Sequence, residues 1–308
     1  MARQNMAFLR GRVVKNPTIS INKETGEYNY AMCYLDVVRG FRQVDDDVKF
    51  VKHDHPLIMT RDKEIIDSMR NWKENSIIFV KGPLTTRKME KTSFCPNCQD
   101  ENGNQTKNIA TGNLVYVTPV FVEKLADYDD KQAAVEDIVA HREISNQIYV
   151  MGTLLSDPKL ITTKKGVQFS QYRLAINRKY IIRTDDPAVR TDWPIVKSYG
   201  EQAREDKLYL KYQADVEIDG FLQARNVLRK CKCKKCENLY EWKDHTMELV
   251  PYDVEYISGF KTKDEVEGEA QKSVEDLKQM LFKTAYSDEI TDADSDLKSD
   301  DVNPATIG

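Results

Sequence analysis

A repeat of about 140 residues constrains the fold of this chain more than any other feature of its sequence. Residues 5–14 align with residues 146–155, and a proline follows each segment, at Pro17 and Pro158. The later matches, all 138 residues apart, are Pro56 with Pro194, Gly82 with Gly220, Arg87 with Arg225, Cys95 with Cys233 and Cys98 with Cys236. Because each copy has the length of an ordinary domain, the repeat predicts two similar domains in tandem.

Each copy contains five segments with the pattern of β-strands and one helical segment between the third and the fourth. The strands are predicted at 6–14, 28–38, 56–60, 76–84 and 114–123 with a helix at 61–75, and at 147–155, 167–177, 193–199, 213–222 and 249–258 with a helix at 200–211. This is the element order of the OB-fold, a partly open five-stranded Greek-key barrel. Gly82 and Gly220 fall late in the fourth strand, where a small barrel bends sharply.

The expected fold is therefore mainly β, with two tandem OB-fold domains, each with a short helix, and a disordered acidic tail. The predicted boundaries are OB-fold domain 1 with a Cys-x-x-Cys loop at 1–124, a linker helix at 125–145, OB-fold domain 2 with a Cys-x-Cys-x-x-Cys loop at 146–260, a helical segment at 261–285 and the tail at 286–308. The tail is predicted to be disordered because it has too few apolar residues to form a core.

The charges divide unevenly between the body and the C-terminal segment. Residues 261–308 contain 6 Lys and 13 Asp or Glu, which leaves 40 basic and 37 acidic residues, a net charge of +3, in residues 1–260. A basic body with an acidic arm is consistent with a nucleic-acid binder, and equally with an ordinary solvated surface that carries a disordered end. The sequence has neither a secretory leader nor a membrane-spanning apolar run, so we expect a cytoplasmic protein.

Both copies resemble the bacterial and phage single-stranded DNA-binding protein (SSB) family, as a divergent tandem member with Cys-x-x-Cys loops. The resemblance rests on Asn146, Gly152, Leu154, Asp157-Pro158, Gly166, Leu174-Ala175 and Thr191-Asp192-Trp193 in the second copy, and on Asn5, Gly11, Pro17, Gly82 and Thr86-Arg87-Lys88 in the first. It implies sequence-independent binding and protection of single-stranded DNA in replication or recombination, with partner recruitment through the acidic tail.

The family stacks single-stranded bases on aromatic side chains, which implies this role for Tyr180, Trp193 and Tyr199 in the second copy and Phe41 in the first. The first copy has His55 in the place of Trp193. Cations that interleave with these aromatics would contact the phosphates, namely Arg39, Arg42, Arg87, Lys88, Arg173, Arg178, Arg225, Arg229 and Lys230. Tyr28, Tyr30 and Tyr34 share one face of a predicted strand, which the sequence does not assign to the core or to the DNA side.

Five of the six cysteines fall in two clusters, whereas Cys33 lies in an apolar stretch and is expected in the core. Closely spaced cysteines in a reducing compartment indicate metal ligands rather than disulfides, and a structural zinc site needs four ligands. Two arrangements are open. One joins the copies through Cys95, Cys98, Cys233 and Cys236, and the other is local to the second copy, with Cys231, Cys233, Cys236 and His245. The alternative to zinc is a set of free or redox-active thiols.

No phosphate-binding glycine loop and no His-Glu-x-x-His motif occurs, so the sequence favours a binding protein over an enzyme. A second hypothesis is an OB-fold protein-interaction module, such as a primosome or transcription accessory factor. A third is a subunit of an enzyme whose activity lies in another chain. Because bacterial SSBs commonly assemble four barrels, a homodimer of this two-barrel chain is expected.

Overall fold

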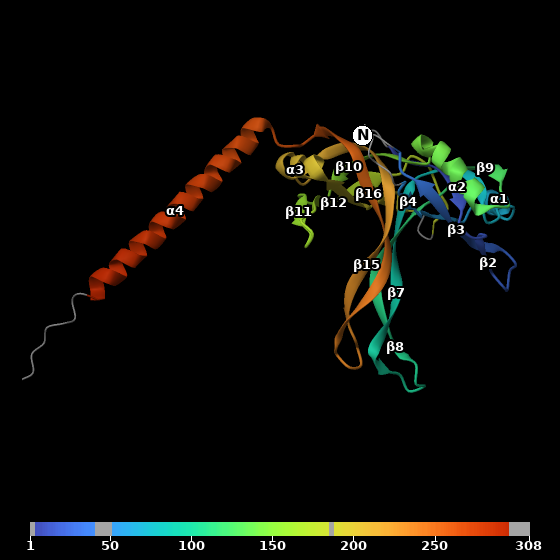
Figure 1. Cartoon of the computed structure of the whole chain (residues 1–308), viewed down its shortest axis with the longest axis horizontal. Coiled ribbons are helices and arrows are strands. Elements are labelled where there is room, and N and C mark those ends of the chain that lie inside the picture. Colours follow the sequence, from blue (N-terminus) through green and yellow to red (C-terminus); the bar gives the residue numbers. More distant parts are fainter. Residues whose placement is uncertain (1–3, 41–50, 185–187, 296–308) are drawn as a thin grey trace, which may run out of the picture. The chain divides into compact units, whose positions relative to one another are not determined.

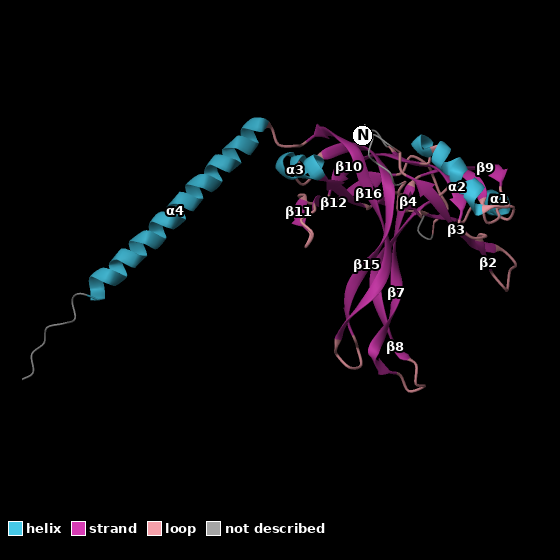
Figure 2. Ribbon diagram, in the orientation of Figure 1, coloured by secondary structure: helices cyan, strands magenta, loops and turns pink. Residues whose placement is uncertain are grey.

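The structure is a computed structural model that describes residues 4–40, 51–184 and 188–295. Met1–Phe260 form one compact unit and Lys261–Gly308 form another. Strands make up most of the first unit, whereas the described part of the second contains helix α4 (Lys263–Ser295) (Figures 1 and 2). No helix within the described ranges is both long and apolar enough to span a membrane.

The first unit contains two OB-fold barrels, as predicted. The elements of the first barrel are β1 (Asn5–Val13), β2 (Thr18–Ile21), β3 (Tyr28–Val38), β4 (His53–Asp54), β5 (Leu57–Thr60), α1 (Lys63–Met69), β6 (Ser76–Gly82), β7 (Leu84–Gln99), β8 (Gln105–Val117) and β9 (Phe121–Asp127). β1 pairs with β3 and β6, and β5 closes the barrel by pairing in parallel with β8. Helix α1 begins after Asp62, whose side chain accepts hydrogen bonds from two backbone amides of the first turn.

The second barrel repeats this arrangement after a linker that contains α2 (Lys131–Ala140) and a 3-10 turn, η1 (Arg142–Ile144). Its elements are β10 (Asn146–Leu154), β11 (Lys159–Thr162), β12 (Gln168–Asn177), β13 (Thr191–Asp192), β14 (Ile195–Tyr199), α3 (Gly200–Tyr209), β15 (Asp215–Lys232) and β16 (Leu239–Ser258). β14 closes this barrel against β16, again in parallel. Cys33 and Trp72 are buried in the apolar core, which is continuous through both barrels.

The barrels are joined by antiparallel pairing of β1 with β10, and this pairing is self-complementary. Asn5 pairs with Val150 and Leu9 with Asn146, while Asn5 and Leu9 match Asn146 and Val150 in the repeat. Ala7 pairs with Ile148, its own match, at the centre. The two barrels are therefore related by an approximate two-fold axis that passes through this strand pair.

The segments between the fourth and fifth strands were expected to be long loops, but they form antiparallel hairpins. β7 pairs with β8 from Leu84 to Phe94 and again at Gln99, and β15 pairs with β16 along its whole length. The two hairpins extend side by side from the barrels (Figure 1). Both are rich in polar and charged residues, so the sequence lacks the apolar alternation that marks a half-buried strand.

The predicted strand 114–123 is two strands in the structure, because β8 ends at Val117 and β9 begins at Phe121. Pro119 lies in this break and has no N–H to donate to a neighbouring strand. The chain here passes very close to Gly82, where an added Cβ would lie 2.0 Å from the carbonyl oxygen of Thr118. Any other residue at Gly82 would force the barrel wall apart.

Helix α4 extends past the predicted boundary of the helical segment at 285 and ends at Ser295. No proline occurs between Lys263 and Ser295, and proline is the residue that most strongly ends a helix. The remainder of the predicted disordered tail, residues 296–308, lies outside the described part of the chain.

Candidate nucleic-acid interface and cysteine cluster

The tips of the two hairpins bring four cysteines together. Cys95 and Cys98 come from β7, and Cys233 and Cys236 come from the turn between β15 and β16. Their Sγ atoms all lie within 4.8 Å of one another, with Cys95 at 3.7 Å from Cys236 and Cys98 at 3.5 Å from Cys233. The two contacts match each other in the repeat, so the cluster lies on the approximate two-fold axis.

Two of the sulfurs, those of Cys95 and Cys233, accept hydrogen bonds that stabilise a thiolate. The backbone amides of Asn97 and Lys235, which match in the repeat, each donate to a Cys Sγ at 3.4 Å. Hydrogen bonds from the backbone amides of Cys236 and Lys235 outweigh burial and lower the pKa of Cys233 to about 6. Burial raises the pKa of Cys95 to about 12. The pKa values of Cys95 and Cys233 therefore differ widely. A bound cation would stabilise the thiolate form of the cysteines that hold it.

The geometry of the cluster fits a tetrahedral thiolate site. A zinc–sulfur distance of about 2.3 Å places the four sulfurs roughly 3.8 Å apart, close to the distances in the structure. All six cysteines are free thiols. Of the two sequence-based arrangements, the structure brings together the one that joins the domains. This Cys95, Cys98, Cys233 and Cys236 cluster could hold a metal ion.

The other two predicted ligands lie outside that cluster. Cys231 lies on β15 opposite Tyr240, and His245 lies on β16 opposite Asn226. Five residue steps along β15 separate these two pairs, which is roughly 16 Å in an extended strand. A site composed of Cys231, Cys233, Cys236 and His245 would require that β16 leave this pairing, so the local arrangement does not fit the fold.

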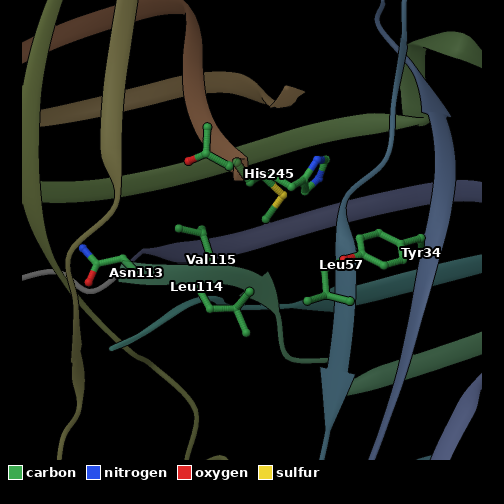
Figure 3. Close-up of a pocket in the computed structure, with 8 residues that line it drawn as sticks. Tyr34, Leu57, Asn113, Leu114, Val115 and His245 are labelled. Carbon is green, nitrogen blue, oxygen red and sulfur yellow. The ribbon is translucent and has the colours of Figure 1, made fainter. Parts of the chain in front are cut away.

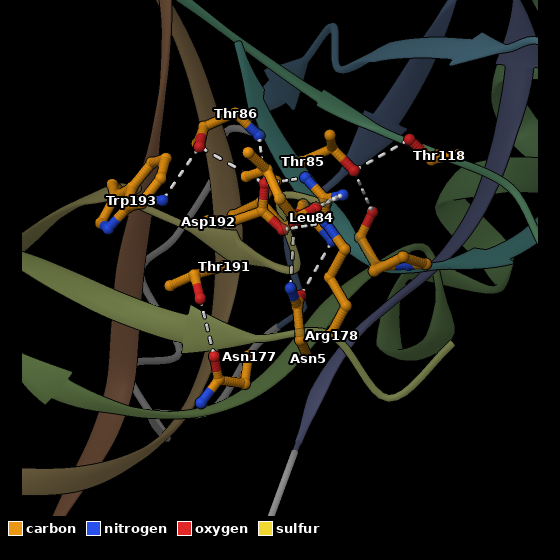
Figure 4. A network of polar contacts seen from close by, with 12 residues as sticks. Asn5, Leu84, Thr85, Thr86, Thr118, Asn177, Arg178, Thr191, Asp192 and Trp193 are labelled. Carbon is orange, nitrogen blue, oxygen red and sulfur yellow. Dashed lines mark hydrogen bonds and ion pairs between the residues drawn. The ribbon is translucent and has the colours of Figure 1, made fainter. Parts of the chain in front are cut away.

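Further contacts along the hairpins hold the two domains together. The Ser93 and Tyr240 hydroxyls lie 2.7 Å apart, and Lys91 forms a 2.6 Å ion pair with Asp244. At the base of the hairpins, the Thr86 amide donates to Asp192, and Arg178 binds the same carboxylate at 2.5 and 2.7 Å (Figure 4). The contact between the domains at Asp192 is thus polar and hydrogen-bonded.

The contact at Asp192 has a matching contact in the other domain. The Ala224 amide donates to Asp54 at 3.0 Å, and Arg39 binds this carboxylate at 2.6 and 3.0 Å. The side chains of Asp54 and Asp192 are both fully buried. Two of the cations expected at the phosphates, Arg39 and Arg178, are therefore used here to neutralise buried carboxylates.

The other predicted cations differ in their exposure and partners. Arg225 pairs with Glu248 at 2.9 Å and Arg229 pairs with Asp244 at 2.5 Å. The exposed cations at predicted positions include Arg87, Lys88, Arg173 and Lys230. Phe41 and Arg42 lie outside the residues that the structure describes.

The predicted stacking residues of the second domain occupy different environments. Trp193 is 39% exposed, and its backbone amide donates to the Thr86 hydroxyl at 2.9 Å (Figure 4). Tyr180 is partly buried, and Tyr199 packs against Phe169 with ring centroids 5.9 Å apart. Trp193 therefore offers an aromatic surface to solvent from a backbone position fixed by the other domain.

One aromatic pair at the interface was not anticipated. The Tyr34 ring of domain 1 meets the His245 ring of domain 2 edge to face, with centroids 6.0 Å apart. The sequence places Tyr34 on one strand face with Tyr28 and Tyr30, without assigning that face to the core or to the DNA side. Tyr34 is now seen to be 41% exposed, whereas Tyr28 packs against the core and donates to Asp67. Strict alternation along β3 would place Tyr28 and Tyr34 on the same face of the strand. The pairing of β2 with β3 is irregular between Ser20 and Ile21, opposite the stretch from Tyr30 to Tyr28, and beyond this irregularity Tyr28 turns toward the core.

Comparison with known proteins identifies the second domain. Residues 145–237, which carry Trp193, match the model of the single-strand binding protein family. These residues form a domain of the single-strand binding protein family. This SSB-family domain is the repeat partner of domain 1, whose barrel has the same strand order.

Solved structures extend the likeness to both domains. The wild-type single-stranded DNA binding protein from Thermus aquaticus is 18% identical, with a TM-score of 0.52 over 85% of this chain and 97% of that chain. A deletion mutant of the Thermus aquaticus protein is 19% identical, with a TM-score of 0.51 over 85% of this chain and 100% of that chain. This likeness establishes a shared fold for the SSB-family domain and its repeat partner. A comparison with curated protein sequences finds no match.

Proposed function

We propose that the protein binds single-stranded DNA without sequence preference and protects it during replication or recombination, with no catalytic role. The observation that carries this proposal is the exposed Trp193 on the SSB-family domain. An aromatic ring that reaches solvent from a fixed backbone position can stack on any of the four bases.

The charges around the barrels support the same proposal. The exposed Arg173 lies on β12, and the exposed Lys230 lies on β15, in the hairpin of the same domain. Lys88 lies on the hairpin of domain 1. Cations at these positions would neutralise phosphates while the bases stack, and their contacts would be independent of sequence.

The test is a titration of the full chain with labelled oligothymidine and with a duplex of equal length, at two salt concentrations. We expect tighter binding to the single strand, with an affinity that falls as salt rises because bound counterions are released. Equal or tighter binding of the duplex would contradict the proposal.

A zinc ion held by the cysteine cluster is the structural part of the proposed function. Zinc at this position would join the tips of the two hairpins and fix one domain to the other. The paired N–H···S hydrogen bonds support this assignment because they favour the thiolate form that zinc requires.

The proposed function includes assembly and recruitment as well. Two chains would form a homodimer with four barrels, and light scattering that gives the mass of one 35.6 kDa chain would contradict it. Residues 286–308, with their seven Asp or Glu and one Lys, would recruit replication or recombination proteins through basic surfaces on those partners.

A further inference from the structure

A pocket on domain 1 lies beside Tyr34 and has a volume of about 510 Å³. Along β3, Ala31, Cys33 and Leu35 are buried, whereas Met32 is partly exposed and Tyr34 is exposed. The outward side chains of this strand therefore form one wall of the pocket. The chain from Val14 to Asn16 and His55 form the others.

The chemistry of the lining fits a nucleotide. Val14, Met32 and the Tyr34 ring provide apolar and aromatic surface, while Lys15, Asn16 and His55 provide polar groups at the rim. Small-molecule sites combine a mainly apolar lining with a few polar groups in this way. A base has flat apolar faces and polar edges, and the phosphate attached to it would meet the exposed Lys15.

The repeat assigns this pocket to the same place as Trp193 on the other domain. His55 matches Trp193, as both lie one residue after the buried Asp54 or Asp192. Tyr34 pairs with Leu57 and Arg173 pairs with Ile195, and Leu57 matches Ile195 at the 138-residue spacing. Tyr34 therefore occupies the position of Arg173.

The two domains thus exchange the positions of their aromatic and basic side chains. Domain 2 has Arg173 on the second barrel strand and Trp193 before the third, whereas domain 1 has Tyr34 and then His55. Each domain keeps one Tyr or Trp ring and one Arg or His side chain in this region. The missing tryptophan of domain 1 is replaced by a ring on the neighbouring strand.

Domain 2 contributes directly to the position of the Tyr34 ring. His245 meets that ring edge to face, and both lie at a small cavity of about 20 Å³ that Leu57 and Val115 also line (Figure 3). The cavity is the size of a single water molecule, so domain 2 packs closely against the Tyr34 ring on this side. One side of the Tyr34 ring thus rests against domain 2, and the other borders the pocket.

We propose that this pocket binds one base of single-stranded DNA, which stacks on Tyr34 while Lys15 contacts the phosphate. The proposal rests on the proposed function and adds a second base-binding position, on domain 1, to the one at Trp193. Both domains would then hold the same strand, each through its own aromatic ring.

The test uses the full chain and oligothymidine, with Tyr34→Ala, Tyr34→Phe and, as a matched control, Ala in place of the exposed Tyr212. Loss of one stacked base should weaken the binding of Tyr34→Ala on the order of 5- to 100-fold. Tyr34→Phe and Tyr212→Ala should stay within about two-fold of the parent, since phenylalanine stacks as well. Lys15→Ala should reduce the slope of log affinity against log salt by roughly 0.7.

A photocrosslink keeps the test independent of any effect of these variants on folding. Oligothymidine with 5-iodouracil, irradiated on the unmodified chain, should crosslink to the peptide that contains Tyr34. Tyr34→Ala at parental affinity, or crosslinking confined to domain 2, would overturn the pocket assignment while binding through Trp193 persists. A parent chain that binds no oligothymidine at all would instead overturn the proposed function.

Discussion

The backbone amide of Thr86 in the first barrel donates a 2.7 Å hydrogen bond to the buried carboxylate of Asp192 in the second. The same carboxylate neutralises Arg178, which is only 6% exposed. The Asp192 side chain therefore neutralises a buried charge in its own domain and accepts a hydrogen bond from the other domain. This double role makes Asp192 a sensitive position for the stability of the pair.

Replacement of Asp192 by Ala should lower the free energy of unfolding by about 3–5 kcal/mol, because it leaves a buried guanidinium without its carboxylate. Urea denaturation followed by circular dichroism measures the change. Asp54→Ala should cost a similar amount, since Asp54 holds Arg39 and the Ala224 amide in the same way. The exposed Asp253→Ala is the control and should change stability by less than about 0.5 kcal/mol. A cost below about 1 kcal/mol for Asp192→Ala would contradict the role given to it.

Oligothymidine should quench the intrinsic fluorescence of the chain, and Trp193→Ala should remove most of this quenching. Trp193 is 39% exposed, whereas Trp72 is buried in the core and Trp242 packs beside the cysteine cluster. Fluorescence titration of the parent and of Trp193→Ala measures the effect. Trp242→Phe serves as the control and should keep the quenching. If Trp193→Ala is quenched as strongly as the parent, Trp193 is not a stacking residue.

Natively purified protein should contain about one zinc ion per chain. Cys98→Ser should lose the metal, while Cys231→Ser and His245→Ala should keep it, because neither residue lies in the four-cysteine cluster. Elemental analysis after dialysis measures the content, and a chelator strong enough to remove the ion should lower the thermal midpoint. A metal-free parent chain would contradict the zinc assignment, and loss of zinc in His245→Ala would favour the local site.

Deletion of residues 287–308 should tighten the binding of single-stranded DNA at low salt and have little effect at high salt. The deleted segment carries a strong negative charge and is tethered to a body with a net charge of +3, so it competes with DNA at high effective concentration. Salt screens this competition, since the Debye length is about 10 Å at 0.1 M. Oligothymidine affinities at two salt concentrations measure it. A full-length variant with the Asp and Glu of 287–308 replaced by Asn and Gln should reproduce the deletion. An unchanged low-salt affinity would show that the segment does not compete.

Acid should reduce the stability difference between the parent and Asp137→Asn. Burial raises the pKa of Asp137, but hydrogen bonds from Arg10 and Tyr128 outweigh it, so the pKa lies below its ordinary value. A lowered folded-state pKa stabilises the protein above the unfolded value of about 3.9, and this contribution is lost as the pH falls through the folded value. Urea unfolding at pH 7 and below pH 4 measures the difference. A difference that stays constant across this range would contradict the ion pair's contribution.

The barrels could be predicted from the sequence because the patterns of their strands and helix are local and occur in both copies of the repeat. Alternating strand patterns and a helix between the third and fourth strands gave the OB-fold order, and a second copy at a fixed spacing supported each assignment. The hairpins could not be predicted in this way. Polar stretches such as Thr85 to Ser93 pair as strands because they extend the β7–β8 pairing outward from Leu84 and Val117, where it begins at the barrel.

The candidate sites depend on contacts between the domains, which the sequence leaves open. The cysteine spacing allowed two sets of four ligands, and the approximate two-fold axis set by the β1–β10 pairing brings one set together. In the same way, sequence cannot distinguish an arginine that faces a phosphate from one that faces a buried carboxylate. The sequence predicts the same role, contact with phosphate, for Arg178 and Lys230. In the structure Arg178 is buried against Asp192, whereas Lys230 is exposed.

The self-complementary pairing of β1 with β10 also protects both barrels from edge-to-edge strand pairing with other chains. The first halves of these strands, residues 5–9 and 146–150, would be open sheet edges in an isolated barrel. Open edges are templates for aggregation. Here each edge covers the other within one molecule, and the linker keeps the two together at any dilution. The two barrels therefore remain paired even at very low protein concentration, at which a pair of barrels from separate chains would dissociate.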